Sequence, residues 1–180
     1  MKNQTKLFLL TFFLLITFTI PALADNTVKN ISGAVYFSPK GDCTEAIVNE
    51  ISHAKSEIYV QAYSFTSAPI AKALVDAHKR GIKVEVILDK SQRKERYTSA
   101  TFLANGGIPT YIDSVHAIAH NKIIVIDKET VITGSFNFTK SAEEKNAENL
   151  LILQSKELAS KYLMNWTKHK SHSEPYSGRE

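Results

Sequence analysis

The sequence predicts an α/β fold in which one mixed, largely central β-sheet is covered by helices on both faces within a single domain. Short runs of β-branched residues alternate with segments whose apolar residues recur at helical spacing, a pattern typical of a helix-covered sheet. A 24-residue leader leaves 156 of the 180 residues, enough for one domain with a substantial core. Cys43 is the only cysteine, so no intramolecular disulfide can form, and we expect it to be a buried residue rather than a nucleophile.

Residues 1–24 are typical of a cleavable secretory signal. Lys2 and Lys6 precede an apolar run, and small residues lie at the expected cleavage point after Ala24. The rival interpretation, a membrane anchor, needs roughly 18 apolar residues, and the uninterrupted run is shorter. We therefore expect cleavage after Ala24 and export, either to the periplasm or out of the cell. Cleavage lowers the formal net charge from +4 to +2, and this mildly basic balance tolerates a polyanionic partner without requiring one.

Seven short runs have the composition of strands. They are rich in β-branched or aromatic residues, and several alternate apolar with polar side chains. Turn signals such as Asn105-Gly106-Gly107 separate them. In chain order, the expected strands are residues 33–38, 57–65, 82–88, 108–112, 122–127, 129–133 and 150–154.

Helical patterns fill most of the intervals between these strands. The first places Ile47 and Ile51 on one inner face, and the second has Pro69 in its first turn, where a missing N–H costs little. Ser155 is a suitable N-cap for the last, which carries Trp166. In chain order, the expected helices are residues 42–55, 67–81, a short one ending at residue 105, 139–145, and one from residue 155 through residue 166. We expect residues 169–180 to be a frayed tail.

Two residues at the start of the expected strand 122–127 suggest phosphoryl chemistry. His120 and Lys122 are two apart, and side chains at that spacing share a face in extended backbone. A neutral imidazole can attack phosphorus, and an adjacent ammonium can stabilise the charge that develops on the non-bridging oxygens without a metal. An isolated His-x-Lys pair would more often be structural, so the neighbouring residues decide the interpretation.

Further polar residues lie downstream at suitable spacing. Gly134 allows close approach of the backbone, while Ser135 and Asn137, again two apart, offer a hydroxyl and an amide as phosphate donors. Glu148 stands beside the start of the last strand. A carboxylate there can accept the second ring N–H of His120 and hold the reactive tautomer.

The pattern His-x-Lys, four residues, Asp, then Gly-Ser-x-Asn resembles the phospholipase D superfamily, and it fits at His120, Lys122 and Asp127. The similarity extends to QAYSF at residues 61–65 and AENLLIL at residues 147–153, and it is strongest to the short bacterial endonuclease branch. It implies a phospholipase D-like domain over residues 25–180, with no cofactor, in which His120 forms a covalent phosphohistidine. By the same resemblance, Lys122, Ser135 and Asn137 hold the phosphate and Glu148 orients His120. Asp127 completes the motif and is grouped with the catalytic residues, although its place at the far end of a strand suggests a structural or pairing role.

The motif occurs once in this chain, whereas larger members of the superfamily carry it twice. An in-line displacement needs a nucleophile on one side of phosphorus and an acid near the leaving oxygen on the other. One imidazole cannot occupy both positions. We therefore expect a symmetric homodimer in which His120 of each subunit faces one shared phosphate.

Other signals are weaker. His116 and His120 are four apart, but Lys122 would repel a cation and no cysteine cluster is present, so we expect no metal site and activity in the presence of a chelator. The basic run at residues 90–96 either contacts a nucleic-acid backbone or is a solvated loop. Phe136 and Phe138 either stack on bases or belong to the core, which we favour for at least one of them.

The sequence-based hypothesis is an exported, metal-independent endonuclease without sequence specificity, acting on DNA or RNA. A compact domain leaves little room for an acyl-chain groove, and mild basicity suits a polyanion. The alternative is a phospholipase D that hydrolyses membrane phospholipids such as phosphatidylcholine, since both substrates are phosphodiesters. A third hypothesis, a non-catalytic nucleic-acid-binding module, has no need of a nucleophile with an orienting acid.

Overall fold

The computed structural model describes residues 27–178, so the expected leader lies outside the described residues. The strands are β1 (Ser32–Ser38), β2 (Glu57–Ala62), β3 (Lys83–Asp89), β4 (Thr110–Asp113), β5 (Lys122–Ile126), β6 (Thr130–Gly134), β7 (Glu148–Gln154) and β8 (Glu174–Tyr176). The helices are α1 (Cys43–Ser52), α2 (Ala68–Lys79), α3 (Ala100–Asn105), α4 (Lys140–Glu144) and α5 (Lys156–Lys170), with a 3-10 turn, η1, at Lys90–Arg93.

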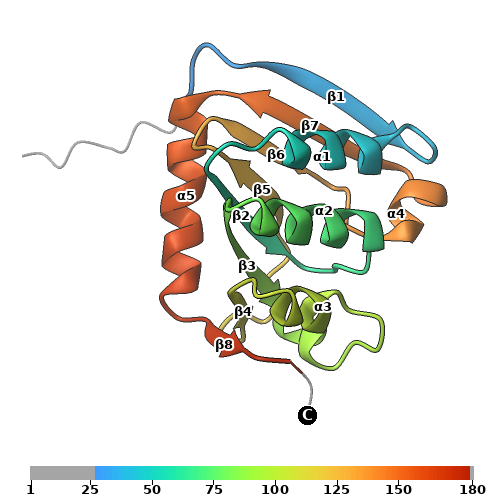
Figure 1. Ribbon diagram of the computed structural model, residues 1–180. Coiled ribbons are helices and arrows are strands. Elements are labelled where there is room, and N and C mark those ends of the chain that lie inside the picture. Colours follow the sequence, from blue (N-terminus) through green and yellow to red (C-terminus); the bar gives the residue numbers. More distant parts are fainter. Residues whose placement is uncertain (1–26, 179–180) are drawn as a thin grey trace, which may run out of the picture.

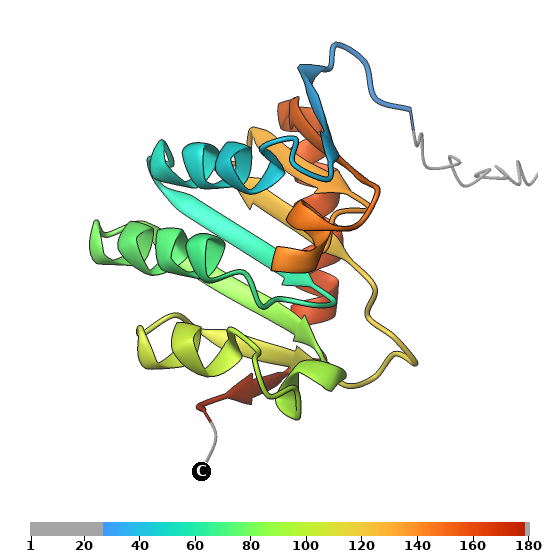
Figure 2. The ribbon, with the colours of Figure 1, turned by 90° about the vertical axis from the view of Figure 1, so that its right-hand side faces the viewer.

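All eight strands form one sheet in the order β1-β7-β6-β5-β2-β3-β4-β8 (Figure 1). Strands β2, β3 and β4 are parallel and are connected through α2 and α3, while β5, β6, β7 and β1 are joined antiparallel. Helices α1, α2 and α3 cover one face and α5 covers the other, as the turned view shows (Figure 2). The predicted mixed sheet with helices on both faces is confirmed. Within residues 27–178, no helix combines the length and apolar character needed to cross a bilayer.

The core has two layers that follow the alternation of each strand. Beneath α1 and α2, it includes Ile47, Ile51 and Leu74, all fully buried. Beneath α5, a smaller cluster surrounds Trp166, whose Nε1 donates a hydrogen bond to the Val60 carbonyl at 2.9 Å. Because an indole N–H needs a partner when it is buried, this bond fixes α5 on the sheet.

Three aromatic and sulfur side chains that might have had chemical roles belong to the core. Phe136 and Phe138 are both fully buried, so neither can stack on a base. Cys43 is also buried, and burial raises the pKa of its thiol to about 11. The thiol is therefore protonated at neutral pH, and the prediction that Cys43 is a buried residue rather than a nucleophile is confirmed.

The expectation of a frayed tail at residues 169–180 is wrong for the part that the structure describes. Helix α5 continues to Lys170, and β8 then pairs antiparallel with β4 at the edge of the sheet. The Tyr176 ring is buried, and its hydroxyl lies 2.9 Å from Thr101 Oγ1. A three-residue edge strand containing Pro175 has almost no periodic signal, and an edge position tolerates the missing proline N–H.

Candidate active site

One hollow of about 380 Å³ opens where β5 begins, β6 ends and β7 begins. It is lined by His120, Lys122, Gly134, Ser135, Asn137 and Glu148. The antiparallel order β5-β6-β7 brings these strand ends together, since Ile123 pairs with Thr133 and Gly134 pairs with Leu150. The sequence thus predicted six residues that the fold assembles around one cavity, although they span 29 positions from 120 to 148.

Lys122 is the most enclosed cation of this pocket. Its side chain is buried, and Nζ donates a hydrogen bond to the His120 carbonyl at 3.0 Å. Burial lowers the pKa of Lys122, and the charge of Glu148 acts in the opposite direction. No other hydrogen bond from Nζ is formed within residues 27–178, so two of its three N–H groups can donate to a substrate oxygen.

His120 is exposed at the rim of the pocket and its ring packs on Tyr63, with ring centroids 4.6 Å apart. Tyr63 also lies under Lys122, whose Nζ is 5.2 Å from the ring centroid. Among the described residues, neither ring nitrogen of His120 has a hydrogen-bond partner. Both nitrogens are therefore accessible to a substrate and to a group from outside this chain.

Glu148 lines the same pocket but does not hydrogen-bond to His120 within the described residues. Its Oε1 accepts a hydrogen bond from Asn146 Nδ2 at 3.2 Å. In turn, Ser38 Oγ donates to the Asn146 carbonyl at 3.0 Å. These bonds anchor Glu148 at the start of β7 and leave its other oxygen available, so its orienting role stays a prediction.

Ser135 is arranged as a hydrogen-bond donor. Its Oγ accepts hydrogen bonds from the Asn149 backbone N–H at 3.0 Å and from Asn149 Nδ2 at 3.3 Å. Because both lone pairs of the hydroxyl are occupied, its proton must point elsewhere, and the pocket lies beside it. Asn149 was not singled out from the sequence, although the family-like segment at residues 147–153 contains it.

The glycine before Ser135 is required by the backbone. Gly134 has φ +148, and a Cβ added there would lie 2.3 Å from the Asn149 carbonyl oxygen. Three residues later, Oδ1 of Asn137 is buried without a hydrogen-bond partner among the described residues. This oxygen is an acceptor and would pair with a donor, so a phosphate contact from Asn137 would have to come from Nδ2 and stays a prediction.

The structure corrects the grouping of Asp127 with the catalytic residues. Asp127 follows the far end of β5, away from the pocket, and its carboxylate accepts hydrogen bonds from the backbone N–H groups of residues 55, 56 and 57 and from Ser56 Oγ. These four bonds are 2.8 to 3.1 Å long. Asp127 therefore fixes the turn that leads into β2, which is the structural role that its spacing suggested.

The basic run at residues 90–96 is partly committed to internal contacts. Lys90 Nζ donates to the His116 carbonyl at 2.9 Å, and Arg93 forms an ion pair with Glu174 of β8 at 2.6 Å. Arg96 lies over the Tyr97 ring. Two of the four basic side chains thus support the fold, and a substrate-binding role for the loop stays a prediction.

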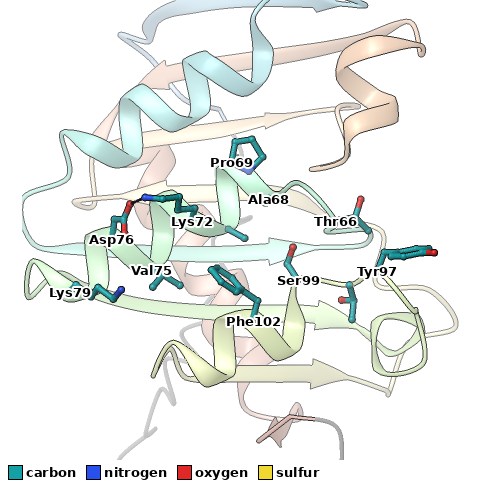
Figure 3. Close-up of a pocket in the computed structure, with 12 residues that line it drawn as sticks. Thr66, Ala68, Pro69, Lys72, Val75, Asp76, Lys79, Tyr97, Ser99 and Phe102 are labelled. Atoms are coloured by element: carbon teal, nitrogen blue, oxygen red, sulfur yellow. Dashed lines mark hydrogen bonds and ion pairs between the residues drawn. The ribbon is translucent and has the colours of Figure 1, made fainter.

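A larger hollow, of about 830 Å³, lies between α2 and α3 (Figure 3). It has a mainly apolar lining that includes Pro69, Val75 and Phe102. Among its charged residues, Lys72 and Asp76 are paired with each other at 2.5 Å. Its lining shares no residue with the pocket of His120. Thr66, which lines this hollow, donates its N–H to the carbonyl of Phe138, the residue after Asn137, at 2.9 Å.

A family model described as cardiolipin synthase, PLD-like domain, matches residues 47–169, which include every residue of the pocket. The chain belongs to the phospholipase D superfamily. It is 47% identical over 135 residues to phospholipase D of Rickettsia conorii, covering 75% of this chain and 68% of that protein. It is 31% identical over 110 residues to mitochondrial cardiolipin hydrolase of Mus musculus, covering 61% of this chain and 50% of that protein.

Among solved structures, this phospholipase D-like chain is similar to Nuc from Salmonella typhimurium, described as a phospholipase D family member. The TM-score is 0.79 with 39% sequence identity, covering 82% of this chain and 99% of that chain. The resemblance noted in the sequence is therefore confirmed at the level of the family and the fold. The chain is a phosphodiesterase of the phospholipase D superfamily.

Proposed function

We propose that this phosphodiesterase is an exported endonuclease that cleaves DNA or RNA, without sequence specificity and without a metal, through a phosphohistidine on His120. The observation that carries the mechanism is the arrangement of His120. Its imidazole is exposed, has no hydrogen-bond partner among the described residues, and lines the same pocket as Lys122 and Ser135. The nucleophile and the groups that hold the phosphate thus line the same cavity.

The reaction follows as two displacements. In the first, a ring nitrogen of His120 forms a bond to phosphorus while the bond to the leaving alcohol oxygen breaks, and that oxygen takes a proton from an acid. Lys122, Ser135 and Asn137 stabilise the charge on the non-bridging oxygens. In the second, water attacks phosphorus, loses a proton to a base, and breaks the phosphorus–nitrogen bond, which regenerates His120.

The acid and base of these steps are proposed to come from a second subunit. The pocket of one chain contains a single histidine, and this residue is already the nucleophile. A symmetric homodimer would place a second His120 on the opposite side of the phosphate. Sedimentation and activity measured on one sample test this step, because full turnover by a monomer would contradict it.

Substrate choice rests on the chemistry of the pocket. The cavity around His120 is small, open to the surface and lined mostly by residues with polar side chains, which suits a phosphate in a continuous backbone. Phospholipid is the second candidate, and the apolar groove between α2 and α3 favours it (Figure 3). That groove removes the objection that so short a domain lacks room for an acyl chain. Two of the relatives are also named for lipid hydrolysis, phospholipase D and mitochondrial cardiolipin hydrolase.

A paired assay distinguishes these substrates. Wild-type protein and His120→Ala are incubated in EDTA with plasmid DNA and, separately, with phosphatidylcholine vesicles, and His53→Ala serves as a control for loss of an exposed histidine elsewhere. We expect DNA cleavage that His53→Ala retains and His120→Ala loses. Head-group release without DNA cleavage would replace the endonuclease by a phospholipase. DNA cleavage that survives in His120→Ala would contradict the mechanism.

A further inference from the structure

Four potential metal ligands converge outside the pocket of His120. They are Asp113 at the end of β4, His116 in the loop that follows, His169 in the last turn of α5 and His172 in the link to β8. One ligand atom from each residue lies within 4.8 Å of the others. We propose that these residues form a structural site for a divalent transition metal, with Zn²⁺ as the ion that fits best.

The distances are close to those of a tetrahedral site. Oδ2 of Asp113 lies 2.7 Å from His169 Nδ1, 3.1 Å from His116 Nδ1 and 3.4 Å from His172 Nε2. Ligand atoms around tetrahedral Zn²⁺ at bond lengths of about 2.0–2.1 Å are about 3.3 Å from one another. The oxygen–nitrogen distances bracket this value, while separations within the set extend to 4.8 Å, so side-chain rotations would bring the nitrogens to it.

The surroundings support a ligand set rather than an incidental cluster. Asp113 is fully buried, and the three imidazoles lie within 5.4 Å of one another by their ring centroids. Nε2 of His172 is buried, and its approach of 3.4 Å to Asp113 Oδ2 does not meet the geometry of a hydrogen bond. With three neutral imidazoles and one carboxylate as ligands, a divalent ion and its ligands carry a net charge of +1. Nitrogen and carboxylate ligands of this kind are usual for zinc. The neighbouring cation Lys170 is paired with Glu85 and directed away.

The proposed site would join two regions that are distant in sequence: the end of β4 with the loop after it, and the end of α5 with the link to β8. Figure 1 shows that the lower end of α5 leads directly to β8 beside β4. In the loop at residues 114–121, which contains His116, the Ala119 N–H also donates to Asp89 Oδ2 at 2.7 Å. His120 lies near the end of this loop. A metal would thus fix the C-terminal edge of the sheet and the base of the loop that presents the nucleophile.

The site is separate from the proposed chemistry, and sequence reasoning missed it. The pairing of His116 with His120 was rejected, and the structure indeed directs the His120 ring to Tyr63. The relevant signals were the spacings Asp113-x-x-His116 and His169-x-x-His172. The second pair stood in a segment expected to be frayed, so its two histidines were not considered as partners of residues 113 and 116.

Metal binding can be measured without reference to activity. Untagged protein is stripped with EDTA, transferred to metal-free buffer and titrated with Zn²⁺ against a chromophoric chelator, with Co²⁺ used to report tetrahedral geometry by its visible absorption. His172→Ala removes one ligand. His53→Ala removes an exposed histidine elsewhere, and His120→Ala removes the nucleophile but leaves the four ligands.

We expect one Zn²⁺ per chain, and a rise in Tm of about 5–10 °C at a hundredfold excess over Kd. His172→Ala should weaken zinc binding by at least about 100-fold. Changing a residue that only hydrogen-bonds to a metal ligand lowers metal affinity by up to about 100-fold, and loss of a ligand itself should lower it at least as much. The two control variants should bind as the wild type does. If His172→Ala does not fold, His116→Ala replaces it, because that side chain is 43% exposed. Zinc binding that is absent in the wild type, unchanged in the ligand variants, or lost in His120→Ala would overturn the proposal.

Discussion

Replacing Asp127 by alanine should damage stability while leaving the chemistry intact. The carboxylate accepts four hydrogen bonds, each of a kind that contributes about 1.5–3 kcal/mol when one partner is charged. Three of the four involve exposed donors, which water can satisfy in the variant. The N–H of Glu57 is more enclosed. The residue also has φ 53, a conformation that alanine adopts with a cost of about 1 kcal/mol.

The free energy of unfolding should therefore fall by about 3 kcal/mol, which is less than the sum of four such hydrogen bonds. For a domain of this size it corresponds to a fall in Tm of about 6–12 °C. Because Asp127 lies at the end of β5 opposite the pocket, kcat of the folded variant should stay within about twofold of the wild type. Calorimetry and initial rates at a temperature where both proteins are folded measure the two effects, and Glu129→Ala, an exposed position in the same turn, is the control.

The pH dependence supplies a second readout. Burial alone would raise the pKa of the Asp127 carboxyl, but the hydrogen bonds from residues 55–57 outweigh it and lower the pKa. Its stabilising contribution is therefore complete above the unfolded pKa of about 3.9 and is lost as pH falls through the folded value. The difference in Tm between wild type and Asp127→Ala should be constant near neutral pH and shrink in acid. A variant with unchanged Tm and activity reduced at least about 100-fold would refute a structural role for Asp127.

Four further substitutions test the pocket and its surroundings. Ser135→Ala removes the proposed donor, and kcat/KM should fall about 100-fold with little change in Tm; unchanged kcat/KM would remove Ser135 from the phosphate site. Gly134→Ala places a Cβ 2.3 Å from the Asn149 carbonyl oxygen at a residue with φ +148. We expect chemical denaturation to show a free energy of unfolding lower by about 2–4 kcal/mol. A variant as stable as the wild type would contradict this close approach. Lys94→Glu should reduce the salt dependence of DNA binding by a slope of about 1 if the basic run contacts DNA, whereas Arg93→Glu should mainly lower Tm through loss of its pair with Glu174.

The pocket was predictable because its polar residues are spaced two apart at the ends of strands. His120 with Lys122, and Ser135 with Asn137, each lie on one side of the local backbone, and the fold needs only to bring the two segments together. The order β5-β6-β7 does this through short antiparallel connections, in which neighbours in sequence are neighbours in the sheet. The resemblance of the motif also indicated the phospholipase D superfamily, and the comparisons with known proteins show that the chain belongs to it.

The features that were missed depend on contacts between distant residues. No local pattern in the sequence indicates that the Asp127 carboxylate accepts hydrogen bonds from the backbone of residues 55–57, which lie 70 to 72 positions away. The pairing of β8 with β4 likewise depends on where α5 ends, and three residues carry too little periodicity to be recognised as a strand. The same packing gathers Asp113 and three histidines from two regions of the chain, and it creates the groove between α2 and α3.

The central claim, a covalent intermediate on His120, is tested most directly by the stereochemistry at phosphorus. A chiral phosphorothioate diester of the substrate that wild-type protein cleaves is hydrolysed in isotopically labelled water, and the configuration of the product is determined. Attack by His120 followed by attack by water inverts phosphorus twice, so the account predicts net retention. Net inversion would mean that water displaces the leaving group in a single step, and it would contradict the proposed phosphohistidine.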